Sequence, residues 1–457
     1  MPKPTHWADQ IAERVIHQKR KDVYTCAAGI TPSGTVHIGN FREMITVSLV
    51  AKALEDKGKK VRFIYSWDDY DRFRKIPKNM PKQDVLKDFI GKPIIDTPDT
   101  FGCHKSYAEH NEKQVEDILP VVGIKPEFIY QSGMYRKCRY KDEIKFVLNN
   151  KEKLIHILNK YRKEPLSKDW YPVSIFCKKC GRDKTKVISY DGDYKIRYKC
   201  DCGVQEETDF SKEGNTKLPW RIDWPMRWHF ETVDFEPGGK EHSTPGGSLT
   251  TAREIIKELY NEEAPVYQPY DFIIVKGKGG KMSSSLGNVI TLKDTLDIYE
   301  PEIIRFLFAG TRPNTEFFIS FDLDVLKNYE DFDRLERVYF KVDKVKEEKY
   351  EKMKRIYELS AIKIPKKMPY QPSFRHLTNI VQIFEGDVER VVGYYKLKDA
   401  DDVKKLKERV ARVNNWLEKY AEDDFKFKVN DEEEVKKIGL GEKEKKALLL
   451  LKERLKE

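Results

Sequence analysis

The sequence contains no long apolar run. Hydrophobic residues make up 39% of its 457 positions, which is enough for packed cores. No stretch approaches the roughly 20 consecutive apolar residues that a membrane-spanning helix requires, and residues 1–7 lack the apolar segment of a secretory signal. These absences argue against a membrane protein and against a secreted one. We therefore expect a cytoplasmic chain of several domains, without a membrane partner.

Cysteine is scarce, and two familiar catalytic arrangements are missing. There are seven cysteines, an odd number that does not suit a secreted disulfide framework. No Walker-type phosphate loop and no serine–histidine–acid combination competes for a functional assignment. Lysine and arginine exceed aspartate and glutamate by 86 − 76 = 10. This modest basic excess suits a polyanionic partner and is equally common as a solubility feature.

A glycine-rich loop near the N-terminus is the first candidate for ligand binding. Residues 22–25 begin a strand-like run, and residues 41–54 carry apolar side chains at helical spacing. His37 and Asn40 lie one turn apart at the start of that helix, so both can face one bound group. A helix N-terminus offers unpaired N–H groups and a positive dipole end, which suits phosphate. The alternative is an ordinary strand–turn–helix connection, with the loop residues Gly29, Pro32, Ser33, Gly34 and Gly39.

A second glycine-rich loop, residues 276–288, is basic and contains three consecutive serines. It follows a strand-like run at 272–275 and precedes a helix-like run at 292–298. Lys281 supplies a positive charge, and Ser283 to Ser285 supply hydroxyl donors for phosphate oxygens. Taken alone, this loop fits a solvated linker better. Its pairing with the first loop favours a phosphate site built from both.

Four cysteines predict a metal site. Cys177 and Cys180 form one pair and Cys200 and Cys202 another, on either side of an alternating run with an Asp-Gly turn. Two cysteine pairs that flank a hairpin are typical of a zinc ribbon. We expect one zinc ion with four thiolate ligands here. The basic residues of the ribbon suit nucleic-acid phosphate and, equally, a solvated surface.

An acidic cluster follows the second predicted strand, residues 61–66. Asp68, Asp69 and Asp71 come directly after it. Ligands of open parallel sheets bind beyond the carboxyl ends of the strands, so this cluster is placed to receive a cationic substrate. A solvated acidic turn is the alternative.

The two loops together resemble those of a class I aminoacyl-tRNA synthetase. Residues 36–40, Val-His-Ile-Gly-Asn, are similar to the HIGH signature, with Asn40 in place of the second histidine. Residues 281–285, Lys-Met-Ser-Ser-Ser, are similar to the KMSKS signature, with Ser284 where a second lysine is common. Further stretches narrow the resemblance to the class I lysyl-tRNA synthetases, typical of archaea and some bacteria: residues 66–71, 99–104, 220–225 and 239–247.

This resemblance implies an α/β fold: a Rossmann-like parallel-sheet catalytic domain with a zinc-binding insertion and an all-helical C-terminal domain. We expect the catalytic domain in two parts, residues 1–73 and 217–322, the second of which contains the serine loop. An insertion with two zinc sites would occupy residues 74–216, and a helical anticodon-binding domain residues 323–457. A helical domain that only stabilises or dimerises is the alternative for the last segment.

The resemblance also implies residue roles for ATP binding. The expected catalytic residues are His37, Asn40, Lys281 and Ser284. His37 and Asn40 would bind the α-phosphate, and the serine loop would hold the departing pyrophosphate. ATP and Mg²⁺ are the expected ligands, and the other nucleotide-binding residues are Pro32, Ser33, Gly34, Gly39, Met282, Ser283 and Ser285.

Lysine and a second zinc ion are the other implied ligands. The residues expected around lysine are Gly29, Thr31, Asp68, Asp69, Trp220, His242 and Tyr270. The expected zinc ligands are Asp99, Cys103, His104 and His110. Their oxygen, sulfur and nitrogen donors suit tetrahedral zinc, although composition alone would favour core packing for them.

The implied activity is that of a lysine–tRNA ligase, which activates L-lysine with ATP to lysyl-adenylate and transfers it to tRNA(Lys), here as a monomer. Such chemistry depends on positioning and charge stabilisation, without a protein nucleophile. Two alternatives stay open. A glutamyl-type synthetase of the same class would need arginine near the acidic cluster, where Arg72 stands. A synthetase-like tRNA-binding scaffold without aminoacylation would have no need of His37 or Lys281.

Overall fold

The structure is a computed structural model that describes residues 6–78, 80–276 and 289–454. The chain divides into two compact units, residues 1–368 and 369–457. Within the described ranges, no helix is both long and apolar enough to cross a membrane. The four domain boundaries expected from the sequence stay predictions, since one compact unit can hold more than one domain.

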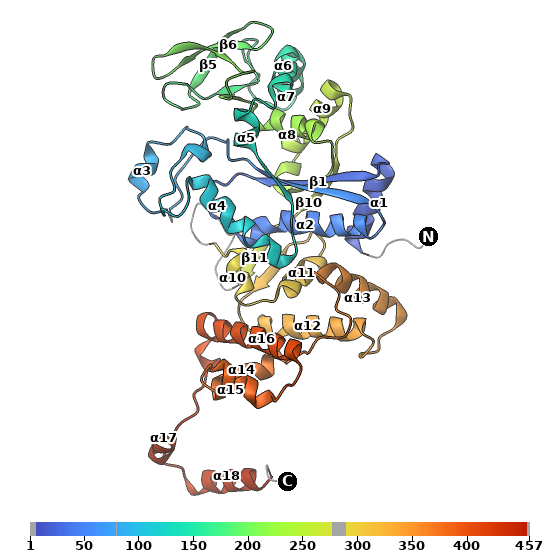
Figure 1. Ribbon diagram of the computed structural model, residues 1–457, viewed down its shortest axis with the longest axis vertical. Coiled ribbons are helices and arrows are strands. Elements are labelled where there is room, and N and C mark those ends of the chain that lie inside the picture. Colours follow the sequence, from blue (N-terminus) through green and yellow to red (C-terminus); the bar gives the residue numbers. More distant parts are fainter. Residues whose placement is uncertain (1–5, 79, 277–288, 455–457) are drawn as a thin grey trace. The chain divides into compact units, whose positions relative to one another are not determined.

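A five-stranded, all-parallel sheet lies at the centre of the first unit (Figure 1). Its strand order is β10-β9-β1-β2-β3, and its strands are β1 (Val23–Ile30), β2 (Lys60–Trp67), β3 (Glu127–Tyr130), β9 (Val233–Gly239) and β10 (Val266–Tyr270). The Rossmann-like parallel sheet is thus confirmed. The chain order reverses between β1 and β9, and ligands of such sheets bind at the carboxyl ends beside this switch point.

Helices cover both faces of the sheet. On one face lie α1 (Trp7–Lys19) and α2 (Ile38–Glu55), and α2 contacts β1, β2 and β9. On the other lie α8 (Trp220–Phe230) and α9 (Ser248–Tyr260), which form a core cluster with residues of β1, β2 and β9. Because both faces are covered, β1 is buried along most of its length and its sequence does not alternate.

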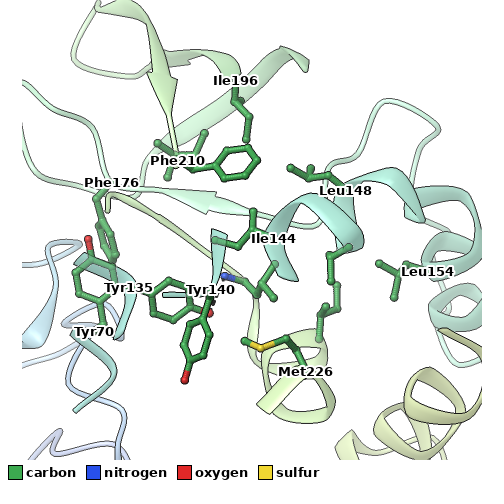
Figure 2. Packing of buried hydrophobic residues seen from close by; sticks show 14 of the residues in the cluster. Tyr70, Tyr135, Tyr140, Ile144, Leu148, Leu154, Phe176, Ile196, Phe210 and Met226 are labelled. Carbon is green, nitrogen blue, oxygen red and sulfur yellow. Dashed lines mark hydrogen bonds between the residues drawn. The ribbon is translucent and has the colours of Figure 1, made fainter. Parts of the chain in front are cut away.

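The segment between β2 and α8 carries most of the expected insertion. Its elements are α3 (Gln83–Lys87), α4 (Tyr107–Glu116), β3, α5 (Gln131–Arg136), α6 (Lys141–Asn149), α7 (Lys151–Asn159), the β4–β8 pair (Ser174–Ile175 and Thr216–Lys217), and the three-stranded β5 (Thr185–Tyr190), β6 (Lys195–Cys200) and β7 (Gln205–Asp209). β3 completes the central sheet, so this segment is not wholly an addition to it. Figure 2 shows its core, in which Ile196 and Phe210 of the small sheet lie near Ile144 and Leu148 of α6.

Two apolar runs of the sequence each contain more than one helix. Residues 146–161 contain the end of α6 and the whole of α7, which are separate because Asn150 has non-helical dihedral angles (φ −105°, ψ 20°). Residues 323–350 contain α12 (Asp324–Tyr339) and the start of α13 (Glu347–Ser360).

These helices follow α10 (Leu292–Leu296), α11 (Pro301–Ala309) and a pair of parallel strands. The strand expected at 272–275 is β11 (Ile273–Lys276), and its partner β12 (Phe317–Ser320) was not expected.

The second unit is helical, as expected. Its helices are α14 (Phe374–Ile383), α15 (Val388–Tyr395), α16 (Ala400–Lys419), α17 (Glu432–Lys437) and α18 (Glu442–Arg454). Glu385 and Gly386 adopt positive φ and separate α14 from α15. Phe374 packs edge-on against the buried Trp416, with ring centroids 6.2 Å apart.

Arg42 connects α2 to the segments around β11 and β12. It is 2% exposed. Its guanidinium donates to the backbone carbonyls of Asp271, Phe272, Arg312 and Thr315 at 2.8, 3.0, 3.1 and 2.6 Å. Since these carbonyls have a buried cation as donor, removing the donor leaves them unsatisfied and desolvated.

We expect Arg42→Met to lower the free energy of unfolding of the first unit by about 3 kcal/mol or more, the scale for removing one partner of a buried charged network. Lys57→Met is the control. Lys57 and its partner Glu13, 3.0 Å away, are both exposed, so the loss of Lys57 should cost about 0.5 kcal/mol. Urea unfolding followed by circular dichroism measures both. Equal losses for the two variants would contradict the role given to Arg42.

Candidate functional site

A pocket of about 530 Å³ lies at the carboxyl ends of the central strands. Gly29 to Thr31 come from the end of β1, Asp68 follows β2, His242 follows β9, and Tyr270 ends β10. The structure therefore brings together residues that are up to 241 positions apart, as 270 − 29 = 241. Of the predicted site residues, the pocket contains Gly29, Thr31, Ser33, Gly34, Asn40, Asp68, Trp220, His242 and Tyr270.

His37 and Asn40 begin α2 together, as the sequence predicted. His37 is the N-cap: its Nδ1 accepts from the Gly39 N–H at 3.1 Å, while Asn40 Oδ1 accepts from the His37 N–H at 3.1 Å. Because Nδ1 accepts a hydrogen bond, the neutral ring carries its proton on Nε2. His37 lines a neighbouring pocket of about 480 Å³ with Val36 and residues 291–294. The backbone N–H groups of the first turn already have acceptors: Ile38 donates to the Ile290 carbonyl at 2.8 Å, and Asn40 to the His37 carbonyl at 2.9 Å. The helix start therefore presents the side chains of His37 and Asn40 to the two pockets.

The rest of the predicted nucleotide site divides in two. Pro32 lies in the loop between β1 and α2, and Gly39 lies in the first turn of α2. Lys281, Met282, Ser283, Ser284 and Ser285 lie outside the residues that the structure describes.

The acidic cluster is paired inside the protein. Asp68 Oδ1 lies 2.7 Å from Arg227 Nη1, and Lys217 Nζ forms an ion pair with Asp71. Burial would raise the pKa of Asp71, but Lys217 outweighs it and lowers that pKa. Asp69 accepts from the N–H of Ser132 at 2.7 Å and lines neither of the two pockets above. Asp68 lines the pocket at strand end β2 with its charge already balanced.

Two half-buried carboxylates that the sequence analysis did not single out lie in the site. Glu43, on α2, accepts from the Gly29 N–H at 2.9 Å and from the Tyr270 hydroxyl at 2.7 Å. Burial of the carboxyl group raises the pKa of Glu43 to about 8. Glu236, on β9, accepts from the indole N–H groups of α8, and burial raises its pKa to about 7. In the sequence, Glu236 stands between Phe235 and Pro237 in a strand, whereas Glu43 follows Arg42 and carries no such signal.

The cysteine quartet converges as predicted. Ligand atoms of Cys177, Cys180, Cys200 and Cys202 all lie within 4.8 Å of one another. The Sγ atoms of Cys177 and Cys202 are 3.7 Å apart, and those of Cys180 and Cys200 3.6 Å apart. Sulfur atoms bound to one tetrahedral zinc at about 2.3 Å have such a separation. The donor set and its spacing fit a closed, four-thiolate metal site.

The second predicted metal set also converges. Donor atoms of Asp99, Cys103, His104 and His110 lie within 4.8 Å of one another. Cys103 Sγ is 3.0 Å from His104 Nδ1 and 3.2 Å from His110 Nδ1. The aspartate is held by the backbone N–H groups of Cys103 and His104, both at 2.8 Å. Four different donors around one point fit a divalent transition metal.

Comparison with known proteins decides the family. The family described as tRNA synthetases class I (K) matches residues 5–363. The chain belongs to this family. It is 55% identical to a lysine–tRNA ligase of Borrelia garinii subsp. bavariensis, over 93% of this chain and 82% of that protein. It is 53% identical to that of Borreliella burgdorferi (98% and 86%) and 43% identical to that of Pyrococcus horikoshii (93% and 82%).

The Glu43 carboxyl of this synthetase should make stability depend on pH. Its pKa is about 8 in the folded protein against 4.5 ordinarily, so between these values the folded state binds more protons and loses stability as the pH rises. In Glu43→Gln, an amide replaces the carboxyl group, so we expect a smaller loss between pH 5 and 9. Urea unfolding across this range measures the difference. A variant that follows the wild-type pH profile would contradict the raised pKa.

Proposed function

We propose that the pocket at the strand ends activates L-lysine with ATP and passes it to tRNA(Lys). Membership of the class I lysyl-tRNA synthetases makes the chain a lysine–tRNA ligase. The observation that carries the assignment to this pocket is its composition. The loop after β1, the start of α2 and the side chains of Trp220, His242 and Tyr270 surround one space. ATP and lysine must meet in one space for a carboxylate to attack the α-phosphate.

The nucleotide phosphates would lie at the start of α2. His37 Nε2–H and the amide of Asn40 would donate to the α-phosphate, where charge builds up in the transition state. Pro32, Ser33, Gly34 and Gly39 would let the backbone approach closely. Lys281, with Met282 and the three serines, Ser283, Ser284 and Ser285, would hold the pyrophosphate. Mg²⁺ bound with ATP would neutralise phosphate charge.

The lysine would lie across the ends of β1 and β10. Gly29 lets β1 lie close to β2 at this point, since a Cβ there would lie 2.9 Å from the Ser66 carbonyl oxygen. Trp220 offers a flat wall for the aliphatic stem, and Thr31, His242 and Tyr270 offer polar groups around the α-amino and carboxylate ends. Asp68 and Asp69 would contribute to the site indirectly, because their carboxylates bind Arg227 and Ser132 inside the protein.

The two donor clusters would each hold zinc, the thiolate site in the ribbon and the mixed site beside α4. Their role is structural, since neither cluster lines the strand-end pocket. The helical second unit would read the anticodon of tRNA, and the protein would act as a cytoplasmic monomer. The domain boundaries 1–73, 74–216, 217–322 and 323–457 are part of this proposal.

A glutamyl specificity is less well supported. Arg72 does line the pocket, but its guanidinium lies 3.3 Å from Asp183 and is half exposed. An arginine that selects glutamate would need to be buried and directed at the substrate. The family match for lysine agrees with this geometry.

The test is amino-acid-dependent ATP–pyrophosphate exchange, run with each amino acid separately. We expect exchange with lysine alone. His37→Ala should slow it by about 10², the scale for removing one donor to transition-state charge. His17→Ala, an exposed histidine of α1, should leave the rate unchanged. Exchange with glutamate or arginine, or an active His37→Ala enzyme, would refute the proposal.

Zinc in the ribbon should support folding more than lysine activation. The small sheet contributes few residues to the core in Figure 2, Ile196, Tyr198 and Phe210 among them, so metal binding should supply much of its folding free energy. We expect Cys180→Ser to release about one zinc per chain and to impair tRNA charging more than pyrophosphate exchange. Cys138→Ser, outside both donor clusters, is the control. Metal analysis and both half-reactions measure this; Cys180→Ser with full metal content would contradict it.

A further inference from the structure

A narrow cavity of about 40 Å³ lies behind the strand-end pocket, between α8 and the sheet. The two spaces share Gly29, Asp68 and Trp220 as lining residues. Small residues of β1, Ala27 and Ala28, form its floor, and the indoles of α8 form its opposite wall. A space of this volume, next to the larger pocket, suits a slender, unbranched side chain better than a branched or planar end group.

Three acidic side chains line this cavity, and two of them are neutralised by the protein. Asp68 pairs with Arg227 at 2.7 Å, and Glu231 pairs with Arg62 at 2.8 Å. Glu236 has no salt bridge to any residue of the described ranges. Its Oε2 accepts from Trp224 Nε1 at 3.0 Å and from Trp228 Nε1. Both indole donors thus meet one oxygen of the carboxylate, and Oε1 has no protein donor among the described residues.

Glu236 also stands at the right depth. It lies three residues before the end of β9 at Gly239, which places it about 10 Å below the carboxyl end of the strand, at about 3.3 Å per residue. A substrate whose carboxylate reacts at the start of α2 can reach this level only with a long side chain. The wall above Glu236 is aromatic: Trp220 and Trp224 stack with ring centroids 5.1 Å apart. Such rings suit methylene groups and attract cations.

We propose that Glu236 receives the ε-ammonium group of the substrate lysine, and that it is the residue by which this site selects lysine. This inference rests on the proposed function of the neighbouring pocket. Oε1 of Glu236 accepts from the ammonium group, while Trp224 and Trp228 hold Oε2 and fix the carboxylate in place. The Arg227 guanidinium does not neutralise Glu236 in place of the substrate, because Asp68 and Asp223 already bind it.

Two other carboxylates without an ion pair among the described residues, Glu43 and Glu241, line the larger pocket and not the narrow cavity. Both oxygens of Glu43 are occupied, by Gly29 and by Tyr270, and Glu43 lines the larger pocket rather than the narrow cavity. Glu43 is therefore a positioning residue, which holds two of the elements that surround the substrate. Glu236 contacts the substrate.

The experiment compares lysine with norleucine, which has the same carbon chain but a hydrogen atom in place of the ammonium group. Pyrophosphate exchange is measured with both for the wild type, Glu236→Gln and Glu258→Gln. We expect Glu236→Gln to raise the KM for lysine about 100-fold, as for loss of a hydrogen bond to a charged group, and to change the KM for norleucine less than about threefold. Glu258 is an exposed acid of α9 that lines neither the cavity nor the strand-end pocket, so Glu258→Gln should keep the wild-type preference for lysine.

The outcomes separate the two proposals. A wild-type protein without lysine-dependent exchange would refute the proposed function itself. An active wild type with a Glu236→Gln variant that still prefers lysine would refute only the role of Glu236. If Glu236 merely orients the indoles, both substrates would weaken equally, which also overturns the inference. If Glu236→Gln does not fold, Glu236→Asp replaces it as the test. Glu236→Asp retains the negative charge and should still prefer lysine to norleucine. Loss of that preference would count against the inference.

Discussion

Glu43 is the point on which the geometry of the site depends. One carboxylate, near the start of α2, accepts from the backbone of β1 at Gly29 and from the side chain of β10 at Tyr270. It thereby ties together three elements that meet only through tertiary contacts. A buried acid at this position carries a desolvation cost. The protein tolerates this cost because the carboxylate fixes the spacing of the strand ends.

Other groups of the site also hold a fixed geometry at the expense of stability. Three carboxylates, Asp68, Asp71 and Asp223, pair with two cations, Arg227 and Lys217, and all five residues are buried or nearly so. Buried ion pairs add little net stability, but they hold charges in fixed places. The result is a pocket whose walls carry fixed internal dipoles and whose remaining negative charge is reserved for a ligand. A cationic amino acid entering such a site replaces water without forcing the protein charges to rearrange.

The sequence predicted what depends on local signals. The strand–loop–helix around His37, the hairpin between the cysteine pairs and the parallel sheet were all predicted from spacing and resemblance. Short strands were missed: β3 and β12 have four residues each, too few for a period to be read. The partners of the acidic cluster were missed for another reason. Arg227 and Lys217 lie about 150 residues downstream of the aspartates they bind, and only the fold joins them.

The reversal of strand order has a consequence for how the protein is made on the ribosome. β1, β2 and β3 lie within the first 130 residues, but β9, which pairs with the other edge of β1, ends at Gly239. During synthesis the nascent chain therefore exposes an unpaired edge at Thr25 and Cys26 for as long as the insertion is being translated. Open strand edges and uncovered apolar faces invite misassociation. This chain therefore most needs chaperones or rapid elongation while β1, β2 and β3 have been made and β9 has not.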